Sequence, residues 1–194
     1  MFDNSWPGWN LMQSGISAGA GLLGVLVGGL VTAHSQRSER RNARIREQLE
    51  GFYSPLIGIR DEIRAKSVVR TNVHSAAGSA FVKTVELHDR NLPADEKEKF
   101  DKVFDYDNVQ MKEDLVPLYQ KMLDLYLKNK WLAEPSTSNF VYEFVEFVEL
   151  WKRYYAGSLP PEVVSAMEHS EKKLYPLYQD LQDTFVRLRN ELRH

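Results

Sequence analysis

The chain has 194 residues, of which 43% are hydrophobic and 27% are charged, a composition typical of a folded protein rather than a disordered one. Its formal net charge of −2 argues against binding to nucleic acid through the phosphate backbone. The absence of cysteine excludes disulfides, thiolate metal sites and a cysteine nucleophile.

The N-terminal part predicts a membrane anchor. Residues 4–36 carry no formal charge, and residues 15–33 include eight isoleucine, leucine or valine side chains and lack the polar face of a soluble helix. A helix of that length spans roughly 28 Å, about the thickness of a bilayer core. We therefore expect a transmembrane helix over residues 14–34, after a short extracytoplasmic tail over residues 1–13. A cleaved signal peptide is the alternative, but the tail lacks the basic side chains that such a peptide requires.

The arginines that follow the apolar segment predict its orientation. Residues 35–50 are expected to form a basic juxtamembrane helix, and basic side chains beside a membrane span stay cytoplasmic. The tail is then outside and residues 51–194 are inside. The same side chains are candidates for a membrane-surface contact with anionic headgroups, although setting the topology is an equally good interpretation. They are Arg37, Arg40, Arg41, Arg44 and Arg46.

The apolar segment also contains small residues at four-residue spacing. In lipid, such a stripe lets two helix backbones approach closely and associate by packing. We expect either a homo-oligomer or pairing with a partner membrane helix, and the alternative is that the segment is simply rich in glycine. The stripe consists of Ala20, Gly24, Gly28 and Thr32.

Apolar residues at helical spacing predict an all-α fold, in which the N-terminal transmembrane helix is followed by a cytoplasmic helical bundle. Gly51 is expected to break the chain between helices, Pro117 to kink or restart one, and Gly157 to cap one. Residues 134–138 are expected to form a loop. The expected helices cover residues 52–70, 75–88, a short acidic stretch from Pro93, 109–131, 140–155, and a last stretch from residue 159 to the C-terminus.

The last expected helix carries apolar residues in steps of four and three, the heptad spacing of packed helices. This seam is expected to pack within its own domain, with Pro176 bending the helix. The seam consists of Leu174, Tyr178, Leu181, Phe185, Leu188 and Leu192.

A sequence echo surrounds three prolines. Leu115-Val-Pro-Leu-Tyr-Gln resembles Leu174-Tyr-Pro-Leu-Tyr-Gln, and Phe52-Tyr-Ser-Pro-Leu is a poorer third copy. A degenerate repeat of helical units is one interpretation, and coincidence in a helical protein is the other.

No catalytic motif is recognisable. None of the five histidines forms HExxH, and the one ExxH pair, Glu191 with His194, lacks the partners that a di-iron bundle needs. An acidic group lacks the ligand order and the central glycine of a calcium loop, so it is expected to be a solvated face. It consists of Asp101, Asp105, Asp107, Glu113 and Asp114.

Aromatic and acidic residues alternate towards the C-terminal third of the chain. Glu143, Glu146 and Glu149 are expected to flank a buried helix, with Glu149 paired to Arg153. Four aromatic residues are expected in the core, and a groove for a partner or ligand is the alternative. They are Trp131, Trp151, Tyr154 and Tyr155.

Several segments resemble an uncharacterised group of small bacterial membrane-anchored helical proteins. They are Trp131-Leu-Ala-Glu-Pro-Ser-Thr, Phe144-Val-Glu-Phe-Val-Glu-Leu-Trp-Lys-Arg, Gly157-Ser-Leu-Pro-Pro-Glu-Val and His169-Ser-Glu-Lys-Lys-Leu-Tyr-Pro-Leu-Tyr, together with Phe52-Tyr-Ser-Pro-Leu after a single hydrophobic helix. The resemblance implies a bacterial source and the same architecture, and it implies no activity.

These features predict a single-pass protein of the bacterial inner membrane, with the N-terminus outside and the C-terminal domain cytoplasmic. The expected function is that of a membrane-anchored interaction or scaffold protein, with no enzyme activity, cofactor or metal. The expected partners are the lipid bilayer and a second copy or another membrane helix, and no nucleic acid. The alternative is an oligomeric membrane effector that forms a pore or disrupts the membrane in stress or phage defence.

Overall fold

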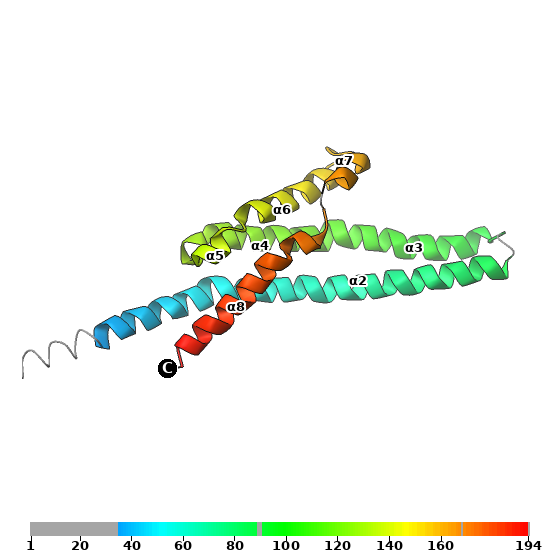
Figure 1. Ribbon diagram of the computed structural model, residues 1–194. Coiled ribbons are helices and arrows are strands. Elements are labelled where there is room, and N and C mark those ends of the chain that lie inside the picture. The colour runs from blue at the N-terminus through cyan, green and yellow to red at the C-terminus, as the bar shows by residue number, and fades with distance from the viewer. Residues whose placement is uncertain (1–34, 89–90, 168, 194) are drawn as a thin grey trace, which may run out of the picture. The chain divides into compact units, whose positions relative to one another are not determined.

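The computed structural model describes residues 35–88, 91–167 and 169–193, and every element assigned in these ranges is a helix (Figure 1). The expectation of an all-α helical bundle is therefore confirmed for this part of the chain. The chain divides into two compact units, Met1–Arg46 and Glu47–His194.

The expected tail over residues 1–13 and the expected transmembrane helix over residues 14–34, with its small-residue stripe, lie outside the described residues. Within the described ranges, no helix combines the length and the apolar composition that a membrane crossing requires. In the first unit, residues 35–46 are α-helical, and all five arginines of the expected juxtamembrane helix are exposed.

The second unit begins with a helix that does not break at Gly51, so that expectation is wrong. Leu49–Tyr53 (η1) is a π-helical turn, and Ser54–Leu87 (α2) continues from it directly. A Cβ atom on Gly51 would lie 2.9 Å from Cδ1 of Leu132, and the Asn129 side-chain amide donates a 2.9 Å hydrogen bond to the Gly51 carbonyl. Glycine therefore serves a close approach between segments here rather than a turn.

The helix α2 also unites two expected helices, 52–70 and 75–88, in a single run of 34 residues. The residues between them include no proline or glycine, so nothing there interrupts the backbone hydrogen bonds. Pro55 is the second residue of α2, a position where the missing N–H costs little.

A second π-helical turn joins the next two helices. Ala94–Gln110 (α3) is followed by the π-helical Met111–Leu115 (η2) and then by Val116–Lys128 (α4). The expected helix start at residue 109 is wrong, because the chain is helical from residue 94 onward. The expected restart at Pro117 is found one residue earlier, since Pro117 is the second residue of α4.

The remainder of the second unit consists of short elements around two longer helices. The expected loop at 134–138 contains a helical turn, and the expected single C-terminal helix is divided, because Pro176 again occupies the second position of a helix rather than its middle. The elements are Lys130–Leu132 (η3), Pro135–Ser138 (α5), Val141–Tyr155 (α6), Pro161–Ala166 (α7), Glu171–Leu174 (η4) and Tyr175–Glu191 (α8).

The core of the second unit lies where α4 packs against α2 and α6, and where α8 packs against α2 and η1. The predicted seam faces this core, which confirms that it packs within its own domain. Leu174, Tyr178, Leu181 and Leu188 are buried, whereas Phe185 and Leu192 are partly exposed. The largest fully buried side chains are Tyr53, Tyr126, Phe52, Phe144, Leu56, Ile63, Leu115, Met122, Leu174, Leu177, Leu181 and Leu188.

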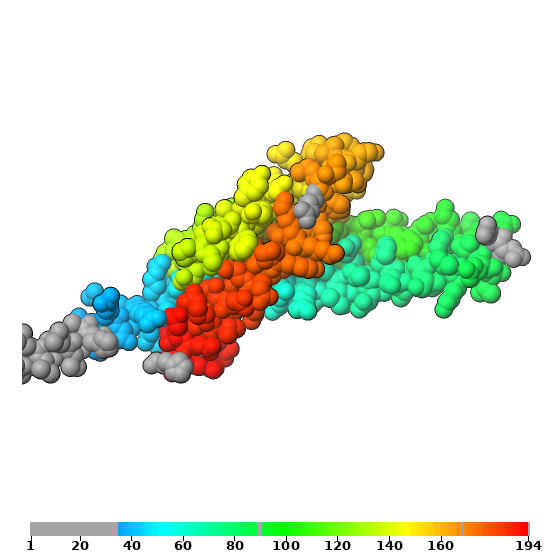
Figure 2. All heavy atoms as spheres, in the orientation of Figure 1, coloured from blue at the N-terminus to red at the C-terminus, as the bar shows by residue number. Residues whose placement is uncertain are grey.

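A helical pair extends from this core and is called the arm below; it consists of residues 64–87 of α2 together with α3. The two helices lie side by side (Figure 1). The buried residues of α2 all precede the arm, and Asp107 is the one buried residue of α3. Phe100, Val103 and Phe104, whose spacing predicts a buried face, are only partly buried. On the face shown in Figure 2, the other described helices leave the outer part of the arm uncovered.

Candidate functional site

The described histidines do not converge on one site. Nδ1 of His74 lies 3.0 Å from a carboxylate oxygen of Asp107, while His88 and His169 contact backbone carbonyls nearby in sequence. His34 and His194 lie outside the described residues, which leaves the ExxH pair with Glu191 untested. No group of three potential metal-ligating side chains gathers anywhere in the described ranges.

The acidic group is solvated only in part. Asp101, Asp105 and Glu113 are exposed, as expected. Asp107 is 5% exposed, and its carboxylate accepts the hydrogen bond from His74. The expectation of a wholly solvated face is wrong at this residue, because Asp107 faces α2 and its hydrogen bond with His74 links α3 to α2 at the base of the arm.

A buried polar network centres on Thr137, which is fully buried. The Tyr53 hydroxyl lies 3.0 Å from the Thr137 hydroxyl, which donates at 2.5 Å to Asp180, and the Tyr126 hydroxyl donates at 2.5 Å to the Thr137 carbonyl. Burial raises the pKa of Tyr53 and Tyr126, so both rings stay neutral donors. The network joins η1, α4 and α8 to α5, and each of these groups has a hydrogen-bond partner, so we interpret it as structural.

The backbone at the end of α6 forms a tight turn that borders a surface pocket. Gly157 has φ +71°, its N–H donates to the Tyr154 carbonyl at 3.0 Å, and the Ser158 N–H donates to the Arg153 carbonyl at 2.9 Å. This pair of bonds defines a Schellman cap, which confirms the expected role of Gly157. The cap turns the chain sharply, so that Pro160 and Pro161 fold back beside the last turn of α6.

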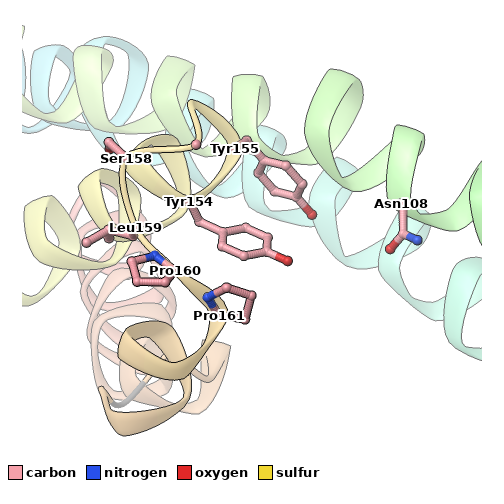
Figure 3. Close-up of a pocket in the computed structure, with 8 residues that line it drawn as sticks. Asn108, Tyr154, Tyr155, Ser158, Leu159, Pro160 and Pro161 are labelled. Atoms are coloured by element: carbon pink, nitrogen blue, oxygen red, sulfur yellow. The ribbon is translucent and has the colours of Figure 1, made fainter.

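The turn forms one wall of a pocket of about 650 Å³. Tyr154 and Tyr155 project their rings into it from α6, and both hydroxyls point toward Asn108 of α3 (Figure 3). Leu159, Pro160 and Pro161 close the opposite side. The pocket therefore combines flat apolar walls with an amide and two phenolic hydroxyls, the mixture common in sites that bind ligands or protein segments.

Trp151 packs against the rings of both tyrosines. Its ring stacks on Tyr155 with an interplanar angle of 24°, and meets Tyr154 and His169 edge to face. The indole Nε1 is buried without a hydrogen-bond partner among the described residues. Burial also raises the pKa of Tyr155, which keeps its hydroxyl protonated. The aromatic cluster is thus a rigid base for the pocket.

None of the four aromatic residues is buried in the core, and a binding groove at three of them stays a prediction. Trp151, Tyr154 and Tyr155 come together and remain partly exposed, as a groove requires, whereas Trp131 is 58% exposed and does not line this pocket. Sequence reasoning missed the other lining residues. The proline pair after a capping glycine was the available signal, whereas no local pattern reveals that Asn108 of α3 lines a pocket with the end of α6.

Glu146 and Glu149 lie on the polar flank of α6, as expected, whereas one carboxylate oxygen of Glu143 is buried without a hydrogen-bond partner among the described residues. Glu149 pairs with Lys152 at 2.9 Å and more loosely with Arg153 at 3.9 Å. Glu146 forms a partly buried ion pair with Lys173 of η4, which holds the C-terminal segment against α6.

No protein-family model matches the chain, and neither a curated protein nor a solved structure is significantly similar to it. The functional assignment therefore depends on the geometry described above.

Proposed function

We propose that this protein is a membrane-anchored interaction protein, in which the helical domain holds a partner protein near the inner face of the bacterial membrane. The observation that carries this proposal is the pocket between α6, the turn at 157–161 and α3. It presents apolar ring faces together with polar groups able to orient a bound segment, and it contains no pairing of a nucleophile with a base among its lining residues.

The partner that fits this pocket is an extended protein segment bearing a proline or another compact apolar side chain. Flat tyrosine rings bind such side chains with little loss of conformational entropy, since each ring has only two rotatable bonds. Tyr155 is further restrained by its stack on Trp151. The hydroxyls of Tyr154 and Tyr155 and the amide of Asn108 supply donors and acceptors for the segment's backbone.

The membrane part of the proposal rests on the sequence and on the exposed arginines. Residues 35–46 include five exposed arginines, and a basic side chain near an anionic membrane surface contributes about 1 kcal/mol to binding. Charge-neutral glutamine replacements at Arg37, Arg40, Arg41 and Arg44 are expected to weaken attachment of residues 35–46 to anionic lipid while the apolar segment keeps the chain in the membrane fraction. Release of the variant into the soluble fraction would show that the arginines, and not the apolar segment, anchor it.

The docking proposal is tested with a photo-crosslinking amino acid at Leu159, beside the tyrosines, and at Tyr142, an exposed position earlier on α6. A discrete adduct is expected from position 159 and none from position 142. The crosslinked protein, once identified and purified, should bind the wild type, and Tyr154→Ala with Tyr155→Ala should weaken its binding at least tenfold. Equal binding by the double variant would refute the pocket as the docking site.

A further inference from the structure

A larger cavity of about 840 Å³ lies between α2 and α8, and the proposed docking function does not use it. One wall is a single face of α2 from Arg60 to Asn72, and the other is the start of α8, from Tyr175 to Gln182. Its lining is dominated by charged, hydroxyl and amide side chains. Such a cavity is suited to a polar ligand rather than to an apolar one.

Two arginines, with Asp61 beside them, line one end of this cavity. Arg60 and Arg64 are one helical turn apart on α2, where like charges repel each other. The Arg60 guanidinium lies 5.1 Å from the centre of the Tyr178 ring and 3.2 Å from Asp61, so its position is fixed. The Arg64 guanidinium is exposed and makes no ion pair with another described residue. Asp61 contacts one nitrogen of the Arg60 guanidinium, so an anion placed between the two arginines would receive hydrogen bonds from the other Arg60 nitrogens and a forked pair from Arg64.

The other end of the cavity is neutral to acidic. Ser67, Thr71 and Asn72 continue the same face of α2, and the Thr71 hydroxyl donates at 2.9 Å to the Ser67 carbonyl. Glu171 of η4 lies beside Tyr178, from whose hydroxyl it accepts a 3.2 Å hydrogen bond. Twelve residues of helix separate Arg60 from Asn72, about 18 Å at 1.5 Å per residue. The ligand that fits is therefore elongated, with an anionic end and a neutral end that offers N–H donors.

An exposed aromatic ring marks the neutral end. Tyr175 is 55% exposed, and its ring centre lies 6.4 Å from that of Tyr178. The helices α2 and α8 run in roughly opposite directions (Figure 1), and Tyr178 contacts Arg60, so Tyr175, one turn earlier on α8, lies towards Ser67 and Thr71. An exposed tyrosine face is a platform on which a planar heterocycle stacks.

We propose that the cavity between α2 and α8 binds a nucleotide, with its phosphates on Arg60 and Arg64 and its base on Tyr175. Asn72 and Glu171 then face the polar edge of the base. This inference is independent of the proposed docking pocket, which shares no lining residue with the cavity.

Isothermal titration of the full-length protein in detergent micelles tests this proposal, with ADP and inorganic phosphate as separate titrants. ADP is expected to bind, and phosphate alone to bind at least tenfold more weakly. Arg64→Gln should lower the affinity for ADP at least tenfold, and Tyr175→Ala should lower it by about tenfold through loss of stacking. Arg153→Gln, which removes an exposed arginine outside the cavity, should leave the affinity unchanged.

Three results would overturn the proposal: no measurable binding of ADP, equal affinities for ADP and phosphate, or ADP binding that Arg64→Gln and Tyr175→Ala leave intact. Both substituted side chains are exposed, so the variants should keep the wild-type circular dichroism spectrum. Arg64→Lys provides a further check, because it retains the charge and loses the forked geometry. Its affinity for ADP is expected to lie between those of the wild type and Arg64→Gln.

Discussion

The two halves of α2 belong to regions that are built differently. The first half contributes Leu56, Ile59 and Ile63 to a core that α4, α6 and α8 surround. The second half buries no side chain fully; it packs against α3, and its first residues line a cavity with α8. The arm exposes Val68, Val69 and Val73 to solvent. The comparison shows that a continuous helix is not a uniform stability unit: its backbone is unbroken, but the free energy that holds it comes from packing, which is concentrated at one end.

The largest expected contrast comes from truncating one phenylalanine in each region. Phe144 is fully buried against Tyr126, whereas Phe81 is partly exposed and meets Phe100 with ring centres 5.3 Å apart. Phe144→Ala should cost about 3–5 kcal/mol, since it leaves a cavity. Phe81→Ala should cost about 1 kcal/mol. Thermal unfolding of the full chain in detergent, followed by circular dichroism, measures both, and equal losses would remove the distinction between core and arm.

The next largest effect is expected from the polar network of the core. Thr137→Val keeps the shape of the side chain but removes the hydroxyl that joins Tyr53 to Asp180. The loss leaves a carboxylate and a phenol without their partner, so the variant should be less stable by about 2–3 kcal/mol. Thr137→Ser retains the hydroxyl and serves as the matched control. If serine and valine variants unfold at the same temperature, the hydrogen bonds of Thr137 contribute nothing measurable.

A smaller effect, confined to the arm, is expected from Asp107. Asp107→Ala removes the hydrogen bond to His74, and the loss of about 1 kcal/mol should speed amide hydrogen exchange in the arm roughly fivefold. Amides of α6 and α8 should keep their wild-type exchange rates, because the arm opens without them. Asp105→Ala, an exposed neighbour, should have no effect. Faster exchange throughout the second unit would mean that arm and core open together.

The smallest effect is expected from replacing either of two glycines of α2 with alanine. A Cβ atom at Gly58 or Gly78 would meet nothing within 4 Å, so alanine adds helix propensity without a clash. Each substitution should stabilise its own region by about 0.5–1 kcal/mol. Gly78→Ala should slow exchange in the arm alone, whereas Gly58→Ala should raise the unfolding temperature of the whole unit. A rise in the unfolding temperature of the whole unit with Gly78→Ala would contradict the independence of the arm from the core.

Sequence reasoning succeeded where a local chemical rule decides the structure. Gly157 caps α6 because only glycine adopts φ +71° without strain, and that rule is independent of packing. The C-terminal seam faces the core because its spacing matches a helix, and helix faces are set by the local period. The partial exposure of Phe100 and Phe104 was not predictable, since it depends on how far α3 extends beyond the helices that cover the core.

Sequence reasoning failed where tertiary contacts override a local rule. Gly51 is a breaker by its residue type, yet it lies within a helix because the side chain of Leu132 needs the space. Asp107 belongs to a run of acidic residues, and only the approach of His74 on another helix distinguishes it. For the pocket, the turn at Gly157 was foreseeable, whereas the contribution of Asn108 from 49 residues earlier in the chain was not.

The π-helical turn at Met111–Leu115 has a consequence for aligning this chain with others. Asp107 of α3 and Leu115, the last residue of η2, are both buried although they are eight residues apart, a spacing that an unbroken α-helix at about 100° per residue would place about 80° out of phase. The turn absorbs the additional residue and brings the two halves back into phase. A related sequence with one residue fewer between positions 107 and 115 would keep every inward position by forming ordinary α-helix. A single-residue gap at this place in an alignment would therefore mark a conserved fold, not a loss of homology.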